Sequence, residues 1–316
     1  METIILRQPS INGGKIMERI ESFVKKMKEK EIVINYVQVY QGNRLLGEYS
    51  RLDRKTRLNV YSVSKSVASI GIGIAIQEGI LQIDTRLQDI FPEYAGRMKH
   101  SGISGITVEH LLTMTCGLQD KLFFSDDEER YQIKDWMTYF FDQVFSYEPG
   151  MHFDYSNFNT YMLSCVIEKV TGQTLLDYMK PRFFEKIGIG NADWLVCPMG
   201  HTTAANGLLL TIDEMSAIGR FLLQEGSWNG ERIVSEEYIR NATRNQIYTN
   251  MPKNGYGYQF WINPDGESYR ADGKYGQYIV VVPKSGLVVT VQALDSKKFY
   301  QDVWTELVLP LKEEIK

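Results

Sequence analysis

Strand-forming runs lie near both ends of this chain, and helical patterns fill the middle. At the N-terminal end, residues 32–41 and 44–50 are rich in β-branched and aromatic residues and flank Gly42-Asn43, as in a β-hairpin. Three further strand candidates lie near the C-terminal end: YGYQFWI (256–262), QYIVVVP (277–283) and LVVTVQAL (287–294). This order favours an α+β fold in which both termini close one sheet domain, with a helical insertion between its halves.

The helical patterns suggest how the chain divides. The clearest predicted helix covers 211–226, where Thr211 and Glu214 stand at the two positions of a capping box. An active site would lie between the sheet and the helical insertion. The predicted divisions are one unit over 1–316, with a sheet part at about 1–60 and 195–316 and a helical part at about 61–194.

Composition excludes several classes of protein. The 316 residues are 43% hydrophobic and 12% aromatic, enough for a substantial core, and the net charge of −4 does not favour nucleic-acid binding. The cysteines and histidines lack the spacing of a disulfide framework or a zinc site, so we expect no metal and no cofactor. These residues are Cys116, Cys165, Cys197, His100, His110, His152 and His201.

The start of the chain carries Glu2 and Arg7 and lacks the apolar stretch of a signal peptide. The most apolar helical run, residues 70–81, is too short to span a bilayer. We therefore expect a protein without a membrane span that acts in the cytoplasm, unless a leader peptide has been removed.

Ser62-Val63-Ser64-Lys65 offers a nucleophile and a base on one predicted helix. A serine hydroxyl needs a nearby proton acceptor, residues i and i+3 share a helix face, and burial lowers the pKa of a lysine. Unpaired N–H groups in the first helical turn can stabilise an oxyanion. The same pattern occurs from Ser22 to Lys25 on a charged amphipathic helix, so on this motif alone Ser62 is better interpreted as an ordinary helix cap.

Tyr155-Ser156-Asn157 is a second candidate. A tyrosine beside a cationic lysine loses its proton more easily and can pass a proton between nucleophile and leaving group. The Asn157 amide can hydrogen-bond both a lysine and a substrate carbonyl. The alternative is a loop in which both side chains support a turn.

The third candidate is Gly273-Lys274-Tyr275-Gly276-Gln277, directly before a predicted strand. Glycine beside a strand lets a ligand approach the backbone, Lys274 can hold a carboxylate, and the N–H of Gln277 can be a second oxyanion donor. The alternative is a glycine-rich turn with a solvated lysine.

In this order, Ser-x-x-Lys, Tyr-x-Asn and Lys-x-Gly resemble the serine β-lactamase and penicillin-binding-protein superfamily. The chain is most similar, over about 35–300, to the class C β-lactamase-like branch, which includes D-alanyl-D-alanine carboxypeptidases and esterases. The resemblance implies an antiparallel sheet flanked by helices, with a mostly helical inserted domain. It also implies that Ser62 is acylated, that Lys65 accepts its proton, and that Tyr155 relays protons and helps to activate the deacylating water.

The resemblance further implies that Asn157 contacts the substrate amide and that Lys274 begins the Lys-Thr-Gly triplet that Gly276 completes. The N–H groups of Ser62 and Gln277 would then form the oxyanion hole. Tyr275 stands where the family has a threonine that helps to hold the carboxylate of a β-lactam or D-alanine. Relatives also often carry His and Ser at the positions of Met114 and Cys116, a change with no mechanistic account.

We therefore expect a serine hydrolase that acts on small esters, amides or peptides through a Ser62 acyl-enzyme. The bulk of Tyr275 makes efficient β-lactam hydrolysis doubtful, although a true class C-type β-lactamase is one alternative. Another is a non-hydrolytic sensor that binds penicillin or peptides.

Overall fold

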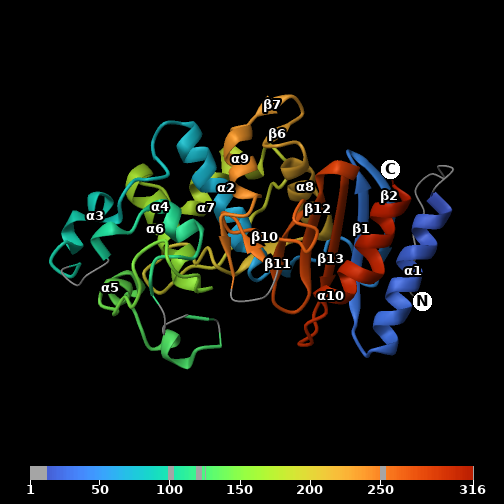
Figure 1. The fold of residues 1–316 in the computed structure, drawn as a ribbon, viewed down its shortest axis with the longest axis horizontal. Coiled ribbons are helices and arrows are strands. Elements are labelled where there is room, and N and C mark those ends of the chain that lie inside the picture. Colours follow the sequence, from blue (N-terminus) through green and yellow to red (C-terminus); the bar gives the residue numbers. More distant parts are fainter. Residues whose placement is uncertain (1–12, 99–102, 119–122, 125, 250–253, 316) are drawn as a thin grey trace.

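The computed structural model describes residues 13–98, 103–118, 123–124, 126–249 and 254–315. Within these residues the main sheet has eight strands, all paired antiparallel (Figure 1). The N-terminal hairpin pairs with the last strand of the chain, so the two termini close one sheet as predicted. The spatial order is β2 (Arg44–Ser50), β1 (Ile34–Gln41), β13 (Leu287–Ala293), β12 (Gln277–Val282), β11 (Tyr269–Gly273), β10 (Trp261–Ile262), β9 (Gly255–Tyr256) and β8 (Ile247–Tyr248).

Helices cover both faces of this sheet, which is why β12 and β13 are buried at every position. Successive side chains of a strand point to opposite faces. On β12, Val280 packs with α1 (Gly13–Glu29) and the C-terminal helical segment 300–314, whereas Ile279 packs against α8 (Ile212–Leu223) on the other face. In Figure 1, α1 lies at the end of the molecule opposite α3 (Leu87–Ile90) and α5 (Trp136–Phe141).

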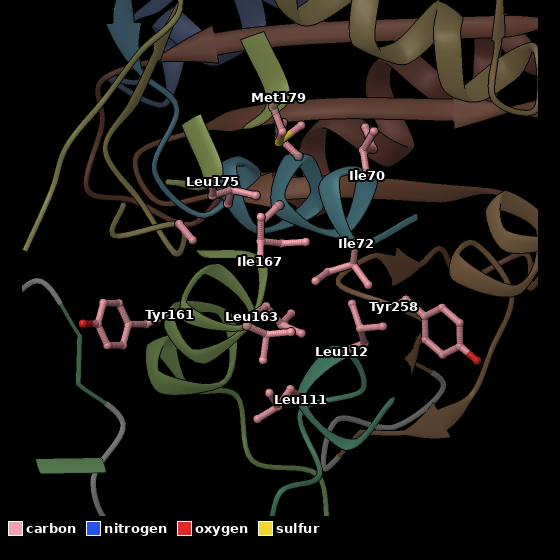
Figure 2. Close-up of a cluster of buried hydrophobic side chains, with 14 of the residues drawn as sticks. Ile70, Ile72, Leu111, Leu112, Tyr161, Leu163, Ile167, Leu175, Met179 and Tyr258 are labelled. Carbon is pink, nitrogen blue, oxygen red and sulfur yellow. The ribbon is translucent and has the colours of Figure 1, made fainter. Parts of the chain in front are cut away.

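The helical part is built around α2 (Val63–Gln77), where every residue from Val63 to Ala75 is buried. A helix that is apolar on all sides requires neighbours on all sides. Figure 2 shows side chains of α2 meeting those of α4 (Val108–Leu112), α6 (Asn157–Thr171) and α7 (Leu175–Met179). Each fully buried aliphatic side chain here contributes about 1.5–3 kcal/mol. This packing fixes the position of α2, whose first residue, Val63, lies next to Gly273 at the end of β11.

Gln259, in the loop between β9 and β10, joins the sheet to three helices. It has a positive φ of 68° and is 2% exposed. Its side-chain amide donates to the carbonyls of Leu111 and Leu112 at 3.0 and 2.8 Å, and its Oε1 accepts from Thr160 at 2.7 Å. Its own carbonyl accepts from Ser66 of α2 at 2.6 Å. One buried residue thus ties the strand edge to α2, α4 and α6.

The sequence prediction of an antiparallel sheet with flanking helices is confirmed, and two elements differ in detail. The run 256–262 was expected to be one strand, but it is split into β9 and β10, because Gly257 packs against the carbonyl of Ala242 and Gln259 turns inward. Strand β11 was not predicted. Its Arg270 and Asp272 are partly or fully buried because they pair with each other at 2.9 Å.

The predicted boundaries near residues 60 and 195 remain a prediction. At these places β3 (Leu58–Asn59) and β4 (Asp193–Trp194) both pair with β5 (Leu208–Leu210) in a separate small sheet. None of the helices formed by the described residues has both the length and the apolarity that a membrane crossing requires.

Candidate active site

Ser62 immediately precedes α2 and makes no capping hydrogen bond with its side chain. The residue before it, Tyr61, has a positive φ of 47°, a conformation that is strained for a residue with a bulky side chain. Ser62 is partly exposed. The geometry therefore does not support the interpretation of Ser62 as an ordinary helix cap, since its hydroxyl accepts no hydrogen bond from a backbone N–H of the helix.

Lys65 lies one turn further on and is 1% exposed. Its Nζ is 3.1 Å from Ser62 Oγ, and it donates to Asn157 Oδ1 at 2.6 Å and to the carbonyl of Ala205 at 2.9 Å. Burial, followed by the positive charge of Arg130, holds the pKa of Lys65 well below its usual value. The amine thus lies beside the serine hydroxyl in surroundings that disfavour its charged form.

Tyr155 lies just before α6 and is partly buried. The centre of its ring is 5.0 Å from Lys65 Nζ. Burial raises the pKa of Tyr155 above the usual value for a phenol, although its hydrogen bond with Ser62 acts in the opposite direction. The sequence predicted that a cationic Lys65 would lower the pKa of Tyr155. The pKa is raised instead, because Tyr155 is buried and Lys65 itself is held toward its neutral form.

Asn157 is the first residue of α6 and is 5% exposed. Its Oδ1 accepts from Lys65, and its Nδ2 donates to the carbonyl of Phe123 at 2.9 Å. Ser156 caps α6 by accepting from the N–H of Phe158, which fixes the start of the helix. Asn157 therefore joins Lys65 to the 123–124 segment, with both of its polar groups already engaged.

The third motif is only partly assembled as predicted. Strand β11 ends at Gly273, so Lys274 is exposed in the hairpin loop rather than on the strand. Its Nζ is 3.1 Å from Asp126 Oδ2. Tyr275 and Gly276 both have positive φ, 64° and 85°, as tight hairpin loops require.

Gln277 is the cross-strand partner of Gly273 and belongs to the next strand of the sheet. It lies on β12 between β11 and β13, is fully buried, and donates through its side chain to the carbonyl of Ala293. Gly273, in contrast, meets the start of α2: a Cβ on it would be 2.4 Å from Val60 O and 3.3 Å from Val63 N. The backbone that borders Ser62 therefore belongs to the end of β11, one strand away from Gln277.

Sequence reasoning did not identify the aromatic residues beside Tyr155. The rings of Tyr256 and Trp261 lie 6.2 and 5.5 Å from the ring of Tyr155, centre to centre, and 4.9 Å from each other. They come from β9 and β10, and the spaced aromatics of YGYQFWI were the only signal for them. The Ala205 carbonyl that accepts from Lys65 could not be predicted from the sequence, because a backbone carbonyl carries no residue-type signal.

The chain matches the Beta-lactamase family over residues 21–308, which covers most of its length. The chain belongs to the Beta-lactamase family. Its sheet, its helical part and the contact between Ser62 and Lys65 lie within the matched residues.

Relatives of this Beta-lactamase family member include named hydrolases. It is 25% identical to the 6-aminohexanoate-dimer hydrolase of Paenarthrobacter ureafaciens over 278 residues, which are 79% of this chain and 70% of that protein. It is 28% identical over 154 residues to penicillin-binding protein 4* of Bacillus subtilis (strain 168), covering 47% of this chain and only 33% of that protein. The structure of a family VIII carboxylesterase superposes with a TM-score of 0.74 at 16% identity, covering 94% of this chain and 95% of the other. The protein is thus a hydrolase of the β-lactamase fold.

Met114 and Cys116, the two positions at which the sequence departs from its resemblance to the family, are both buried. Met114 has a positive φ of 62° and packs with Phe153 and Tyr256. Cys116 is buried, which raises the pKa of its thiol to about 12 and leaves it unreactive at neutral pH. His100 lies outside the described residues.

Proposed function

We propose that this protein hydrolyses small esters or amides through an acyl-enzyme on Ser62, with neutral Lys65 as the base. The observation that carries the proposal is the set of contacts around Lys65 Nζ. A neutral amine has two N–H groups and one lone pair, and two carbonyl-type oxygens, those of Asn157 and Ala205, accept from Nζ. The lone pair is then left for the hydroxyl of Ser62, 3.1 Å away.

In the acylation step, Ser62 Oγ attacks the substrate carbonyl carbon as its proton passes to Lys65 Nζ. The leaving group departs with a proton delivered through the Tyr155 hydroxyl, and Lys65 returns to its neutral form. Water then attacks the ester formed on Ser62 and its proton passes through Tyr155 to Lys65. Lys65 delivers that proton to Ser62 Oγ as the bond to the acyl carbon breaks and the carboxylic acid leaves. The raised pKa of Tyr155 fits a neutral phenol that relays a proton rather than a tyrosinate that removes one.

The second oxyanion donor in this proposal differs from the one that the sequence suggested. We assign it to the backbone N–H of Lys274, directly after Gly273, together with the N–H of Ser62. In this assignment the family's Lys-Thr-Gly triplet corresponds to Ala271-Asp272-Gly273, because Gly273 is the glycine that packs against the start of α2. Two N–H groups that flank one carbonyl oxygen would each contribute about 2.7–4 kcal/mol to the transition state.

Substrate contacts follow from the same arrangement. Asn157 would contact the substrate carbonyl once its bond with Phe123 is exchanged, and Tyr275 would contact the leaving group from the hairpin loop. The rings of Tyr256 and Trp261 would offer apolar contact beside the Tyr155 relay. Small esters and amides with apolar groups fit this set of contacts best.

The proposal is tested by Ser62→Ala, with Ser22→Ala as its matched control. Both serines begin a Ser-x-x-Lys pattern, but Ser22 is exposed on α1. We expect Ser62→Ala to lose p-nitrophenyl ester hydrolysis and labelling by a fluorophosphonate probe, as followed by absorbance and intact mass. Ser22→Ala should keep both. Retained turnover in Ser62→Ala would refute the assignment.

The same measurements separate the two alternative functions. A stable acyl-enzyme with penicillin and no turnover of any substrate would indicate a sensor. Rapid hydrolysis of a chromogenic cephalosporin would indicate a β-lactamase.

A further inference from the structure

The ammonium group of Lys274 already has a carboxylate partner from a distant part of the chain. Asp126 Oδ2 lies 3.1 Å from Lys274 Nζ, and 148 positions separate the two residues in the sequence. Asp126 comes from the segment between α4 and α5, whereas Lys274 comes from the β11–β12 hairpin loop. The pair therefore connects the helical part to the sheet, beside the strand end that borders Ser62.

This contact affects both partners in the direction expected for an ion pair. The hydrogen bond with Asp126 raises the pKa of Lys274, and the bond with Lys274 lowers the pKa of Asp126. The side chains are 45% and 69% exposed, so the pair is accessible and weak enough for a ligand to compete with it. Lys274 also lies over the Tyr275 ring, at 5.2 Å from its centre, and the Tyr275 ring in turn packs edge-on against that of Tyr61.

The charge around Lys274 is unfavourable for an anionic ligand. Asp126 Oδ2 lies 3.1 Å from Lys274 Nζ, and Asp127, Glu128 and Glu129 follow Asp126 in the sequence. A substrate carboxylate approaching Lys274 must displace the like charge of Asp126. At about 4 Å, two such charges repel by about 1–4 kcal/mol at the dielectric of a protein surface or of water.

We propose that Asp126 is a specificity-determining residue that occupies Lys274 in place of a substrate carboxylate, so that the enzyme prefers substrates without one. The inference rests on the proposed function and narrows its substrate class to uncharged esters and amides. Asp126 touches no reacting atom and acts only through Lys274.

The test compares matched substrates that differ by one carboxylate. Phenyl acetate and 4-acetoxybenzoate differ on the leaving group, and p-nitrophenyl valerate and mono-p-nitrophenyl glutarate differ on the acyl group. In Asp126→Asn we expect the ratio of kcat/KM, neutral over anionic, to fall by about three- to tenfold for at least one pair. Asp126→Glu should keep the wild-type ratio.

Two controls separate the contact from the general electrostatic field. Asp127→Asn removes the same charge one residue away, where the carboxylate accepts from the N–H of Phe124 rather than from Lys274. It should change the ratio by less than about twofold. In the double variant Asp126→Asn with Lys274→Met, the ratio should return to the wild-type value. An equal change in Asp126→Asn and Asp127→Asn would overturn the inference.

A binding measurement keeps this inference independent of turnover. On the Ser62→Ala background, isothermal titration calorimetry with glutarate should show about three- to tenfold tighter binding when Asp126→Asn is added. Equal binding with and without Asp126→Asn would refute the role of Asp126 even if esters are hydrolysed. Loss of ester hydrolysis in every form of the enzyme would refute the proposed function and leave the calorimetric result to decide the role of Asp126.

Discussion

The helices α1 and α2 carry the same Ser-x-x-Lys pattern and place it in opposite surroundings. On α1, Ser22 and Lys25 are exposed, and only the other side of the helix packs on the sheet. On α2, Lys65 is 1% exposed and bonded to Ser62, Asn157 and Ala205. Equal spacing on a helix therefore gives a buried, hydrogen-bonded lysine on α2 and a solvated one on α1, and only the first fits the proposed catalytic base.

The largest expected difference between the helices is in catalysis. Lys65→Met removes the proposed base, so we expect kcat/KM for p-nitrophenyl esters to fall by about 10²- to 10⁴-fold. Lys25→Met makes the same change of side chain on the exposed helix and should leave the rate within twofold of wild type. Steady-state kinetics with both variants, checked for folding by circular dichroism, decides the point. A small effect of Lys65→Met would place the base elsewhere.

A smaller difference, in the free energy of unfolding, is expected when a methyl group is added next to α2 and on α1. In Gly273→Ala the new Cβ would meet Val60 O at 2.4 Å, so we expect a loss of about 1–3 kcal/mol in the free energy of unfolding, with reduced activity. In Gly14→Ala on α1 nothing lies within 4 Å of the new Cβ, and a gain of about 0.5–1 kcal/mol is expected. Urea unfolding of both variants measures the two shifts. Shifts of the same sign would contradict the close approach of β11 to α2.

A third difference concerns how the free energy of unfolding depends on pH. The pKa of Lys65 is lower in the folded protein than in the unfolded chain, where it is about 10.4. Between these two pKa values the unfolded chain binds one more proton, so the stability of the wild type rises with pH by up to about 1.4 kcal/mol per unit. Lys65→Met lacks this pH-dependent contribution. The free energy of unfolding of Lys65→Met minus that of wild type should therefore fall as the pH rises from 7 to 10.

Lys25→Met is the reference for that comparison, because it removes a lysine without emptying a buried site. Thermal unfolding at several pH values would measure both differences. A constant difference between wild type and Lys65→Met across this range would mean that Lys65 keeps its proton in the folded protein.

Much of the fold could be predicted because its signals are local. The hairpin around Gly42-Asn43 and the capping box of Thr211 and Glu214 each depend on neighbouring residues, and both are present. The strand β11 was missed because Arg270 and Asp272 look solvent-exposed in sequence. Their contact with each other and the contacts of Arg270 with Asn263 and the Tyr300 ring, which a sequence does not display, make their burial possible.

The site divides in the same way. The Ser62–Lys65 contact could be predicted, since Ser62 directly precedes α2 and Lys65 lies in its first turn. The roles of Lys274 and Gln277 could not, because they depend on where β11 ends and on which glycine packs against α2. The contact between Lys274 and Asp126 joins segments 148 positions apart in the sequence, and neither segment contains a pattern that predicts contact with the other.

Gln259 has a consequence for how the molecule opens and closes. Its hydrogen bonds hold α2, α4 and α6 to one loop of the sheet, so moving any one of these helices away from the loop breaks a buried hydrogen bond to Gln259. We expect their backbone amides to exchange with solvent deuterium at similar, slow rates, as a single cooperative unit. On this expectation the helices that position Ser62, Lys65 and Asn157 would unfold together, and the proposed proton relay would persist as long as that unit does.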